Sequence, residues 1–383
     1  EDADAAGEEG SFYVWTEEEV RRILPRDEAE LAIRSYRIGR DGPTVLTLAE
    51  DPAEGDPRIA EIREKMRFER EKRPKPARDP KVLADWNGLM IAALAKAARA
   101  FGRTDFLAAA ARAADHLLAR LVLPDGSFLR CLDGEEARIP AFLDDHAFLA
   151  WGLLEFYEAG FEARYLEAAA ALVRRAVARF WDEASGGFFF APDFMASEVP
   201  LRKKESYDGA VPSGNAAMML VLLRLARMTG DPAFDERAAR TGAAFSRAIA
   251  RSPASHTLWM SALDLAAGPA AEIVIAGRRQ TADTAALLDI VRTSYLPNAV
   301  ALFKPEDDPP AAKKLAELAP FVSEMRMVNG AAAAYVCSGF ACRAPVTGLE
   351  ELRALPVTRS RTSRNRAPEH SPAGRSGIRG RDE

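Results

Sequence analysis

Acidic, amide and histidine side chains gather where three apolar segments of the sequence begin. The segments start with "DWN" at residues 85–87, "DDH" at 144–146 and "SGN" at 213–215. Paired carboxyl groups can divide acid and base work on a sugar, because one moves a proton while the other stabilises charge or activates water. We therefore expect the catalytic residues to be Asp85, Asp145, His146, Glu205 and Asp208.

Aromatic and polar residues near these groups are expected to hold a sugar, because flat aromatic faces suit the apolar faces of pyranose rings. The predicted substrate-binding residues are Tyr13, Trp15, Trp86, Asn87, Lys204, Tyr207, Asn215 and His256. His146 follows a pair of carboxylates, which is expected to raise its pKa and to favour a role in proton transfer.

Structural roles are an alternative for many of these residues. Asp, Ser and Asn are preferred N-cap residues, so Asp85, Asp144 or Asp145, and Ser213 could each do no more than cap a helix. One helix needs one cap, however, and "LDDHA" supplies two acids and a histidine. Residues 203–205 lie well before the cap, where a solvated loop would suffice, and His256 could be structural as well.

The three polar starts belong to a repeated pair of helices, spaced about 60 to 70 residues apart. The first helix of each pair is apolar nearly all round and the second is amphipathic: 85–102 and 103–121, 144–161 and 162–180, 213–230 and 231–249. A helix without a polar face must be buried, whereas an amphipathic helix has one face in water. The pattern predicts a mainly α fold, an (α/α) toroid. Its inner helices are parallel, so their N-termini should meet at one end of the ring.

The chain is expected to have three parts. Residues 1–268 form the toroid, and 269–355 form a small α/β segment with strands at 271–277, 299–305 and 331–342. This segment is expected to be a strand-helix-strand unit of parallel character. Residues 356–383 are rich in Arg, Ser and Gly without apolar periodicity, which predicts a disordered basic tail. Residues 8–15, "EEGSFYVW", are like the segments that close a helix pair, so we expect the chain to begin partway round its ring.

The composition is that of an ordinary globular protein: 383 residues, 48% hydrophobic, with a net charge of -5. Scattered basic residues argue against nucleic acid, and no apolar run reaches the ~20 residues of a membrane-spanning helix. Three cysteines favour the cytoplasm. Cys337 and Cys342 are interpreted as free, buried thiols, with a redox or disulfide pair as the alternative. No metal or cofactor is expected, because zinc spacing and phosphate-binding glycine loops are lacking.

Several blocks of sequence resemble one known family. They include "DPKVLADWNGLMIAALA", "IPAFLDDHAFLAWGLLEFYEA", "SYDGAVPSGNAAMMLVLLRLA" and "AYVCSGFACRAPVTGLEELRAL". Over residues 1–355 the chain resembles the C-terminal part of thioredoxin-domain-containing proteins related to spermatogenesis-associated protein 20. The resemblance implies a six-hairpin, glycosidase-like toroid that normally follows a thioredoxin-like domain. By this resemblance we expect the chain to lack that domain and the first hairpins, and the family offers no established catalytic residues to carry over.

Two functions remain open at this stage. The first is acid/base chemistry on a carbohydrate, of the epimerase or glycosidase kind, which the toroid implies by fold alone. The second is a non-catalytic module that binds a ligand or serves as a scaffold for a thioredoxin-like domain. A third possibility is that the chain is inactive because its ring is incomplete.

Overall fold

The computed structural model describes residues 2–5, 7–49, 56–197 and 200–355. The chain divides into two compact units, residues 1–81 and 82–383, and each is described by itself. The boundary near residue 81 was not expected from the sequence. The predicted disordered tail, 356–383, lies outside the described residues.

The first unit has a small core of its own. Its elements are β1 (Asp4–Ala5), β2 (Glu8–Glu9), α1 (Glu17–Ile23), α2 (Arg26–Ser35) and α3 (Arg58–Arg70). Helix α1 begins with a capping box, in which the Thr16 hydroxyl accepts from the Glu19 N–H and the Glu19 carboxylate accepts from the Thr16 N–H. Trp15, Tyr36 and Ile62 are buried together. These residues therefore pack on one another as a separate core, although the sequence pattern had assigned them to the ring.

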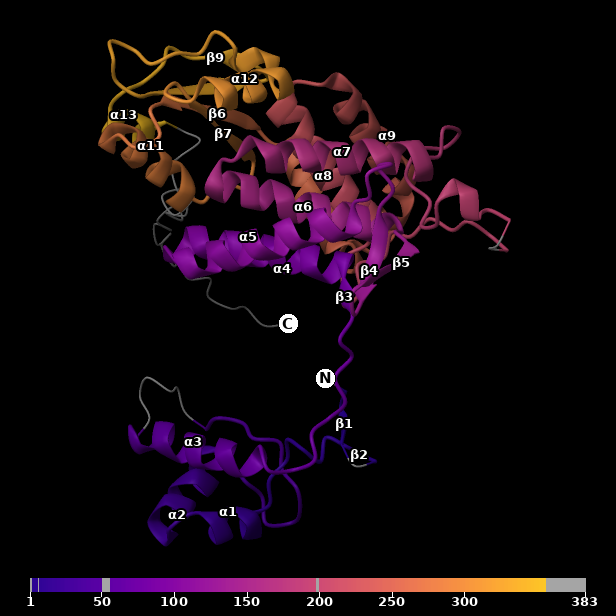
Figure 1. Ribbon diagram of the computed structural model, residues 1–383, viewed down its shortest axis with the longest axis vertical. Coiled ribbons are helices and arrows are strands. Elements are labelled where there is room, and N and C mark those ends of the chain that lie inside the picture. The colour runs from indigo at the N-terminus through magenta and orange to yellow at the C-terminus, as the bar shows by residue number, and fades with distance from the viewer. Residues whose placement is uncertain (1, 6, 50–55, 198–199, 356–383) are drawn as a thin grey trace, which may run out of the picture. The chain divides into compact units, whose positions relative to one another are not determined.

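The second unit is built on three helical hairpins, which Figure 1 shows in magenta and its neighbouring colours. They are α4 (Ala84–Phe101) with α5 (Thr104–Leu121), α6 (Leu143–Gly160) with α7 (Ala163–Phe180), and α8 (Gly214–Thr229) with α9 (Pro232–Arg251), followed by α10 (Thr257–Ala267). Gly102 and Gly230 end α4 and α8 in the left-handed conformation that glycine adopts without strain. The predicted mainly α fold, an incomplete (α/α) toroid, is confirmed.

Burial separates the inner helices from the outer ones. Nearly every residue of α6 and α8 is buried, whereas α7 and α9 each keep a face in water. Helix α4 differs from the prediction, because Trp86, Met90 and Phe101 are 62%, 56% and 75% exposed. Helices α5 and α6 cover its other faces, and no described helix of this unit covers the face that these three side chains occupy.

Helices α4 and α6 approach one another closely at two glycines. A Cβ atom on Gly88 would lie 2.5 Å from the backbone nitrogen of Leu149, and one on Gly152 would lie 2.4 Å from the carbonyl oxygen of Gly88. Real Cβ atoms do not come so near to backbone, so the packing of these two helices requires hydrogen at both positions.

A mixed sheet follows the helical hairpins. Its strands are β6 (Ala271–Gly277), β7 (Ala299–Pro305), β8 (Ala333–Ser338) and β9 (Ala341–Cys342), in the order β7-β6-β8-β9. Strands β6 and β7 are parallel, as predicted, and β8 runs antiparallel to β6. Helices α11 (Ala282–Thr293), α12 (Pro309–Leu318) and α13 (Leu349–Ala354) accompany the sheet (Figure 1). A smaller sheet of β3 (Val82–Leu83), β4 (Leu129–Asp133) and β5 (Glu136–Pro140) lies beside the start of α4.

We expect Gly152→Ala to lower the free energy of unfolding by about 3 kcal/mol, because the new methyl group meets the backbone of α4 rather than a movable side chain. Gly160→Ala, in the same helix, is the matched control. A Cβ there meets nothing within 4 Å, so it should stabilise by about 0.5–1 kcal/mol. Urea unfolding of both variants tests the close contact, and equal midpoints would contradict it.

Candidate active site at the mouth of the helical hairpins

The N-terminal ends of α4, α6 and α8 meet strand β4 and the loop 202–213; we call this region the mouth. Arg130 of β4 joins two of the helices, with its guanidinium nitrogens 3.5 Å from Asp85 Oδ2 and 3.6 Å from Asp145 Oδ2. The loop is joined to α6 through Phe190, whose N–H donates to the Lys203 carbonyl at 2.8 Å and whose carbonyl accepts from the Leu143 N–H at 3.1 Å. The structure thus brings the three polar helix starts together.

Asp144 is a half-buried carboxyl group at the centre of this region. Burial raises its pKa to about 7, and the negative charges of Glu205 and Asp85 act in the same direction. Arg130 and a hydrogen bond from the Gly214 N–H oppose the shift. A Cβ on Gly214 would lie 2.1 Å from Asp144 Oδ1, so glycine at the start of α8 is what admits this carboxyl group.

Asp145, the residue predicted to be catalytic, is fully buried. Its Oδ2 accepts from the Phe142 N–H at 2.8 Å, which caps α6, and its Oδ1 has no hydrogen-bond partner. Burial also raises the pKa of Asp145 to about 7. A carboxyl group without exposed surface does not reach a substrate in this conformation, so the structure gives Asp145 the capping role.

The predicted rise in the pKa of His146 is wrong. Its ring lies edge-on to Phe128 and Phe180, with centroids 4.9 and 5.1 Å apart, and its Nδ1 donates to the Phe142 carbonyl at 3.0 Å. Burial disfavours the charged imidazolium and lowers the pKa to about 4. His146 is therefore a neutral histidine of the core. The loss of hydration on burial has a larger effect on its pKa than the neighbouring carboxyl groups have.

Three further predicted residues hold the backbone in place rather than face a substrate. Asp208 accepts from the N–H groups of Ser213 and Leu258, at 2.9 and 2.8 Å. Lys204 donates to Asp182, Ser185 and Gly186, which belong to the turn that follows α7. Asn215 is fully buried and bonds to the backbone of Phe188 and Glu205.

The remaining predicted polar residues differ in their burial and in their hydrogen-bond partners. Glu205 pairs with Lys203, and its charge acts on Asp144. His256 is buried, donating from Nδ1 to the Ser252 carbonyl at 2.8 Å, with Nε2 3.4 Å from the Ser206 hydroxyl. Asn87 donates to the Leu83 carbonyl at 2.8 Å. Among these three residues, Glu205 is the one whose charge raises the pKa of another acid of the mouth.

The predicted aromatic residues separate into three groups. Trp86 and Tyr207 are exposed, as a sugar-binding surface requires. Trp15 lies in the core of the first unit, 3% exposed and covered by the Arg73 guanidinium at 4.2 Å, so its prediction as a binding surface is wrong. Tyr13 also belongs to the first unit, where the Arg70 guanidinium lies 5.9 Å from its ring.

Sequence reasoning missed Arg130 and the aromatic pair Phe142 and Phe190, whose stacked rings have centroids 5.0 Å apart. A single Arg within an otherwise apolar strand, "FLRCL", was the available signal for Arg130. Asp144 was recognised at the mouth but was not chosen as catalytic. Successive helix residues point about 100° apart, and here Asp144 is half-buried whereas Asp145 is fully buried.

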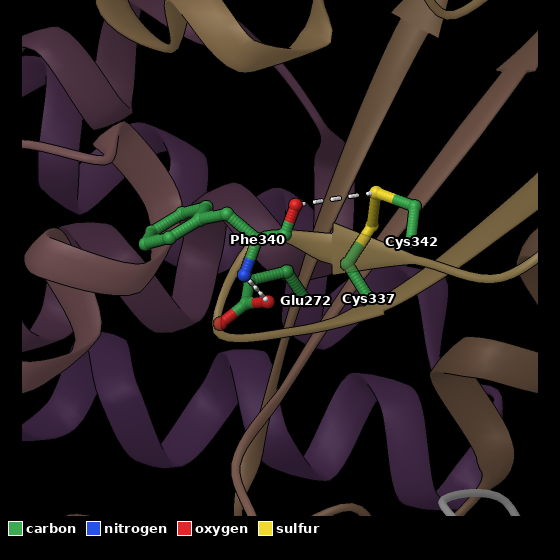
Figure 2. The surroundings of a disulfide bond; sticks show 4 residues. All are labelled: Glu272, Cys337, Phe340 and Cys342. Atoms are coloured by element: carbon green, nitrogen blue, oxygen red, sulfur yellow. Dashed lines mark hydrogen bonds between the residues drawn. A yellow bond between two sulfur atoms is a disulfide. The ribbon is translucent and has the colours of Figure 1, made fainter.

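Cys337 and Cys342 form a disulfide in the structure, so the preferred interpretation as free thiols is wrong and the alternative is correct. They face one another across strands β8 and β9, and the turn between them places Gly339 and Phe340 at φ 57° and 63°. Figure 2 shows Phe340 at this turn, with its N–H donating to Glu272 at 3.2 Å. Cys337 is buried and Cys342 is exposed.

Fold and mouth together define an incomplete (α/α) toroid with an acid-rich opening. In sequence the chain is similar to spermatogenesis-associated protein 20 of Homo sapiens, 33% identical over 93% of this chain and 51% of that protein. The Rattus norvegicus protein is 32% identical over the same shares. The resemblance predicted from the sequence blocks is therefore confirmed. The chain spans about half the length of these curated relatives, and the thioredoxin-like domain stays a prediction.

Solved structures give partial matches. They include an α-mannanase of Bacteroides thetaiotaomicron (21% identity, TM-score 0.37, 45% of this chain and 46% of that one) and a cellobiose 2-epimerase of Bacillus thermoamylovorans (16%, 0.36, 44% and 45%). No protein-family model matches the chain. No helix in the described part of the chain is long and apolar enough to cross a membrane.

The free energy of unfolding should fall as the pH rises from about 4 to about 7. The folded-state pKa values of Asp144 and Asp145 are raised above the unfolded value of 3.8, so the folded state holds more protons in this window. At about 1.4 kcal/mol per pKa unit, each group contributes a few kcal/mol. Asp145→Asn should flatten this dependence, as measured by urea unfolding between pH 4.5 and 8.

Asp105→Asn is the control for this measurement. Asp105 is exposed, and its hydrogen bonds to Arg103 lower its pKa, so it does not titrate between pH 4.5 and 8. Its variant should keep the slope of the wild-type protein. An unchanged slope in Asp145→Asn would show that Asp145 does not bind its proton in this range.

Proposed function

We propose that the mouth binds a carbohydrate and moves protons on it, with Asp144 as the general acid or base. The observation that carries the proposal is a half-buried carboxyl group with a pKa of about 7. A proton-transfer group works best when its pKa lies near the working pH, because both protonation states are then populated. Perturbed carboxyl groups of this kind gather at functional sites.

The neighbours of Asp144 have distinct roles in this proposal. Glu205 supplies the negative charge that helps to hold the proton on Asp144, as a second carboxylate does in sugar-cleaving and sugar-isomerising sites. Arg130 lies beside Asp85 and Asp145 and opposes the build-up of negative charge. Protonated Asp144 can donate to a leaving or ring oxygen, and ionised Asp144 can take a proton from a carbon next to a carbonyl.

Aromatic surfaces at the mouth suit the ring of a sugar. Phe142 and Phe190 are stacked and half-buried, and the Lys203 ammonium lies 5.7 Å from the ring centroid of Phe190. Trp86 is 62% exposed on the first turn of α4, next to Asp85. An apolar face bordered by charged groups can bind the two kinds of surface that a pyranose presents.

Binding without chemistry is the second candidate function. It is favoured by the number of predicted catalytic and binding groups that hold the backbone, namely Asp145, Asp208, Lys204 and Asn215. The mouth would then hold a ligand for the thioredoxin-like domain that the family resemblance implies. The two candidates differ in a single outcome, which is whether a bound sugar is converted.

Thermal unfolding of the chain with a panel of mono- and disaccharides tests the proposal first. A sugar at a hundredfold excess over its dissociation constant adds about 2.7 kcal/mol to the folded state. A raised midpoint followed by product formation, measured by NMR of the sugar, supports catalysis. A raised midpoint without product supports binding alone, and a sharp transition that no sugar moves contradicts both.

With the sugar so identified, Asp144→Asn should lower kcat by about 10²- to 10⁴-fold, because the amide neither donates nor accepts the proton. Binding of the sugar should remain. Asp145→Asn is the matched comparison on the adjacent residue, and it should keep turnover because Asp145 is buried as a cap. Loss of turnover in Asp145→Asn alone would reverse the assignment of the two residues.

Glu205→Gln and Lys203→Gln should move the pH profile of kcat/KM in opposite directions. Removing the charge of Glu205 lowers the pKa of Asp144, so its limb of the profile moves to lower pH. Lys203 interacts with Asp144 by charge, and its loss should move that limb to higher pH. Shifts of the same sign would exclude Asp144 as the titrating group.

A further inference from the structure

A second concave site lies within the second unit, away from the mouth. It is a chamber of about 710 Å³ lined by the later turns of α4 and α6, the middle of α8, the first turns of α10 and residues 291–301. Lys96 and Arg99 of α4 line it, and Lys96 lies about 16 Å further along the helix axis than Asp85. The chamber is therefore distinct from the proposed sugar site.

The two glutamates of the chamber are already neutralised. Glu155 Oε1 accepts from Arg224 at 2.6 Å, from Lys96 at 2.9 Å and from the Trp151 indole at 3.0 Å. Glu158 accepts from Arg224 at 2.8 Å, from Arg99 at 3.2 Å and from the Ala301 N–H at 3.1 Å. Three cations thus surround two buried carboxylates, which gives this group a surplus of one positive charge.

Arg292 adds a further cation. It is half-buried at the end of α11, lines the chamber, and forms no salt bridge with any described carboxylate, although the negative charge of Asp289 in the same helix acts on it. Its Nε is a buried nitrogen without a hydrogen-bond partner. The guanidinium lies 5.1 Å from the ring centroid of Phe161, and Arg99 Nε donates to the Arg292 carbonyl at 3.4 Å. Burial and the charge of Arg99 both lower the pKa of Arg292.

The one other acid of the chamber does not cancel this surplus. Asp264 of α10 is exposed, so water screens its charge. It accepts a hydrogen bond from the Asn298 amide at 3.0 Å. Trp151, Leu258 and Met260 supply apolar wall around the cations. A chamber with apolar walls and a guanidinium that forms no salt bridge favours an anion that also carries a carbon skeleton.

We infer that this chamber binds the oxyanion of a small acidic molecule, a phosphate or a carboxylate, between Arg292 and Arg99. Guanidinium groups bind such oxyanions with two parallel hydrogen bonds. The bound anion separates two like charges, because the positive charge of Arg99 acts on Arg292. The inference rests on the chamber alone and does not depend on the proposed chemistry at the mouth.

Titration calorimetry of the 383-residue chain tests this site, with inorganic phosphate in one arm and D-glucuronate in the other, at constant ionic strength set by KCl. We expect saturable binding in at least one arm. Arg292→Gln should weaken it tenfold or more. Arg292→Lys keeps the positive charge but not the two parallel N–H donors, so it should weaken binding less. Arg247→Gln, an exposed arginine of α9 outside the chamber, should bind as the wild-type protein does.

The outcomes are distinct. Binding of phosphate alone that Arg292→Gln weakens identifies a phosphate site, and binding of glucuronate alone that Arg292→Gln weakens identifies a carboxylate site. Binding that Arg292→Gln leaves unchanged overturns the inference. Absence of saturable binding in both arms, or an equal loss in Arg247→Gln and Arg292→Gln, overturns the inference. Thermal unfolding shows whether Arg292→Gln remains folded, and Arg292→Lys replaces it in the comparison if it does not. Glucuronate bound at the mouth would not be weakened by Arg292→Gln, so binding at the mouth and binding in the chamber can be told apart.

Discussion

The backbones of the inner helices touch, and much of the site follows from that contact. Gly88 and Gly152 let α4 and α6 meet without side chains between them, and Gly214 admits the Asp144 carboxyl group to the start of α8. The acids at the three helix starts are thereby forced into a small volume with little water. Asp85, Asp144 and Asp145 share one guanidinium, that of Arg130. Crowding of this kind raises the pKa of a carboxyl group, and the raised pKa values of Asp144 and Asp145 are its result.

The two ends of the inner helices have opposite electrostatic character. Parallel helices place partial positive charge at their N-termini and partial negative charge at their C-termini. Acids accordingly gather at the mouth, whereas Lys96, Arg99 and Arg224 lie in the later turns of α4 and α8. At the mouth burial is the largest influence on Asp144 and Asp145, and it raises their pKa values to about 7. In the chamber the cations are matched to Glu155 and Glu158 with one charge to spare.

The sheet is part of the same body as the inner helices. The Ala301 N–H of β7 donates to Glu158 of α6 at 3.1 Å, and Arg227 of α8 pairs with Glu272 of β6 at 3.3 Å. Glu272 also accepts from Phe340 at the turn that the Cys337–Cys342 disulfide closes. These bonds explain why residues 82–355 behave as one unit, although the sequence pattern changes near residue 268.

The sequence by itself determined the helical pairs, the parallel strands β6 and β7, and the gathering of polar groups at three helix starts. These features follow from periodicity and from capping residues, which act over a few positions along the chain. Only the tertiary structure decided that Asp144 rather than Asp145 faces the opening, that His146 is a neutral core residue, and that Arg130 joins two helices. Those outcomes depend on groups from distant segments, because burial and charge act through space and are not recorded in any local pattern. The same holds for Arg292, whose lack of a salt bridge becomes apparent only when its neighbours in the chamber are known.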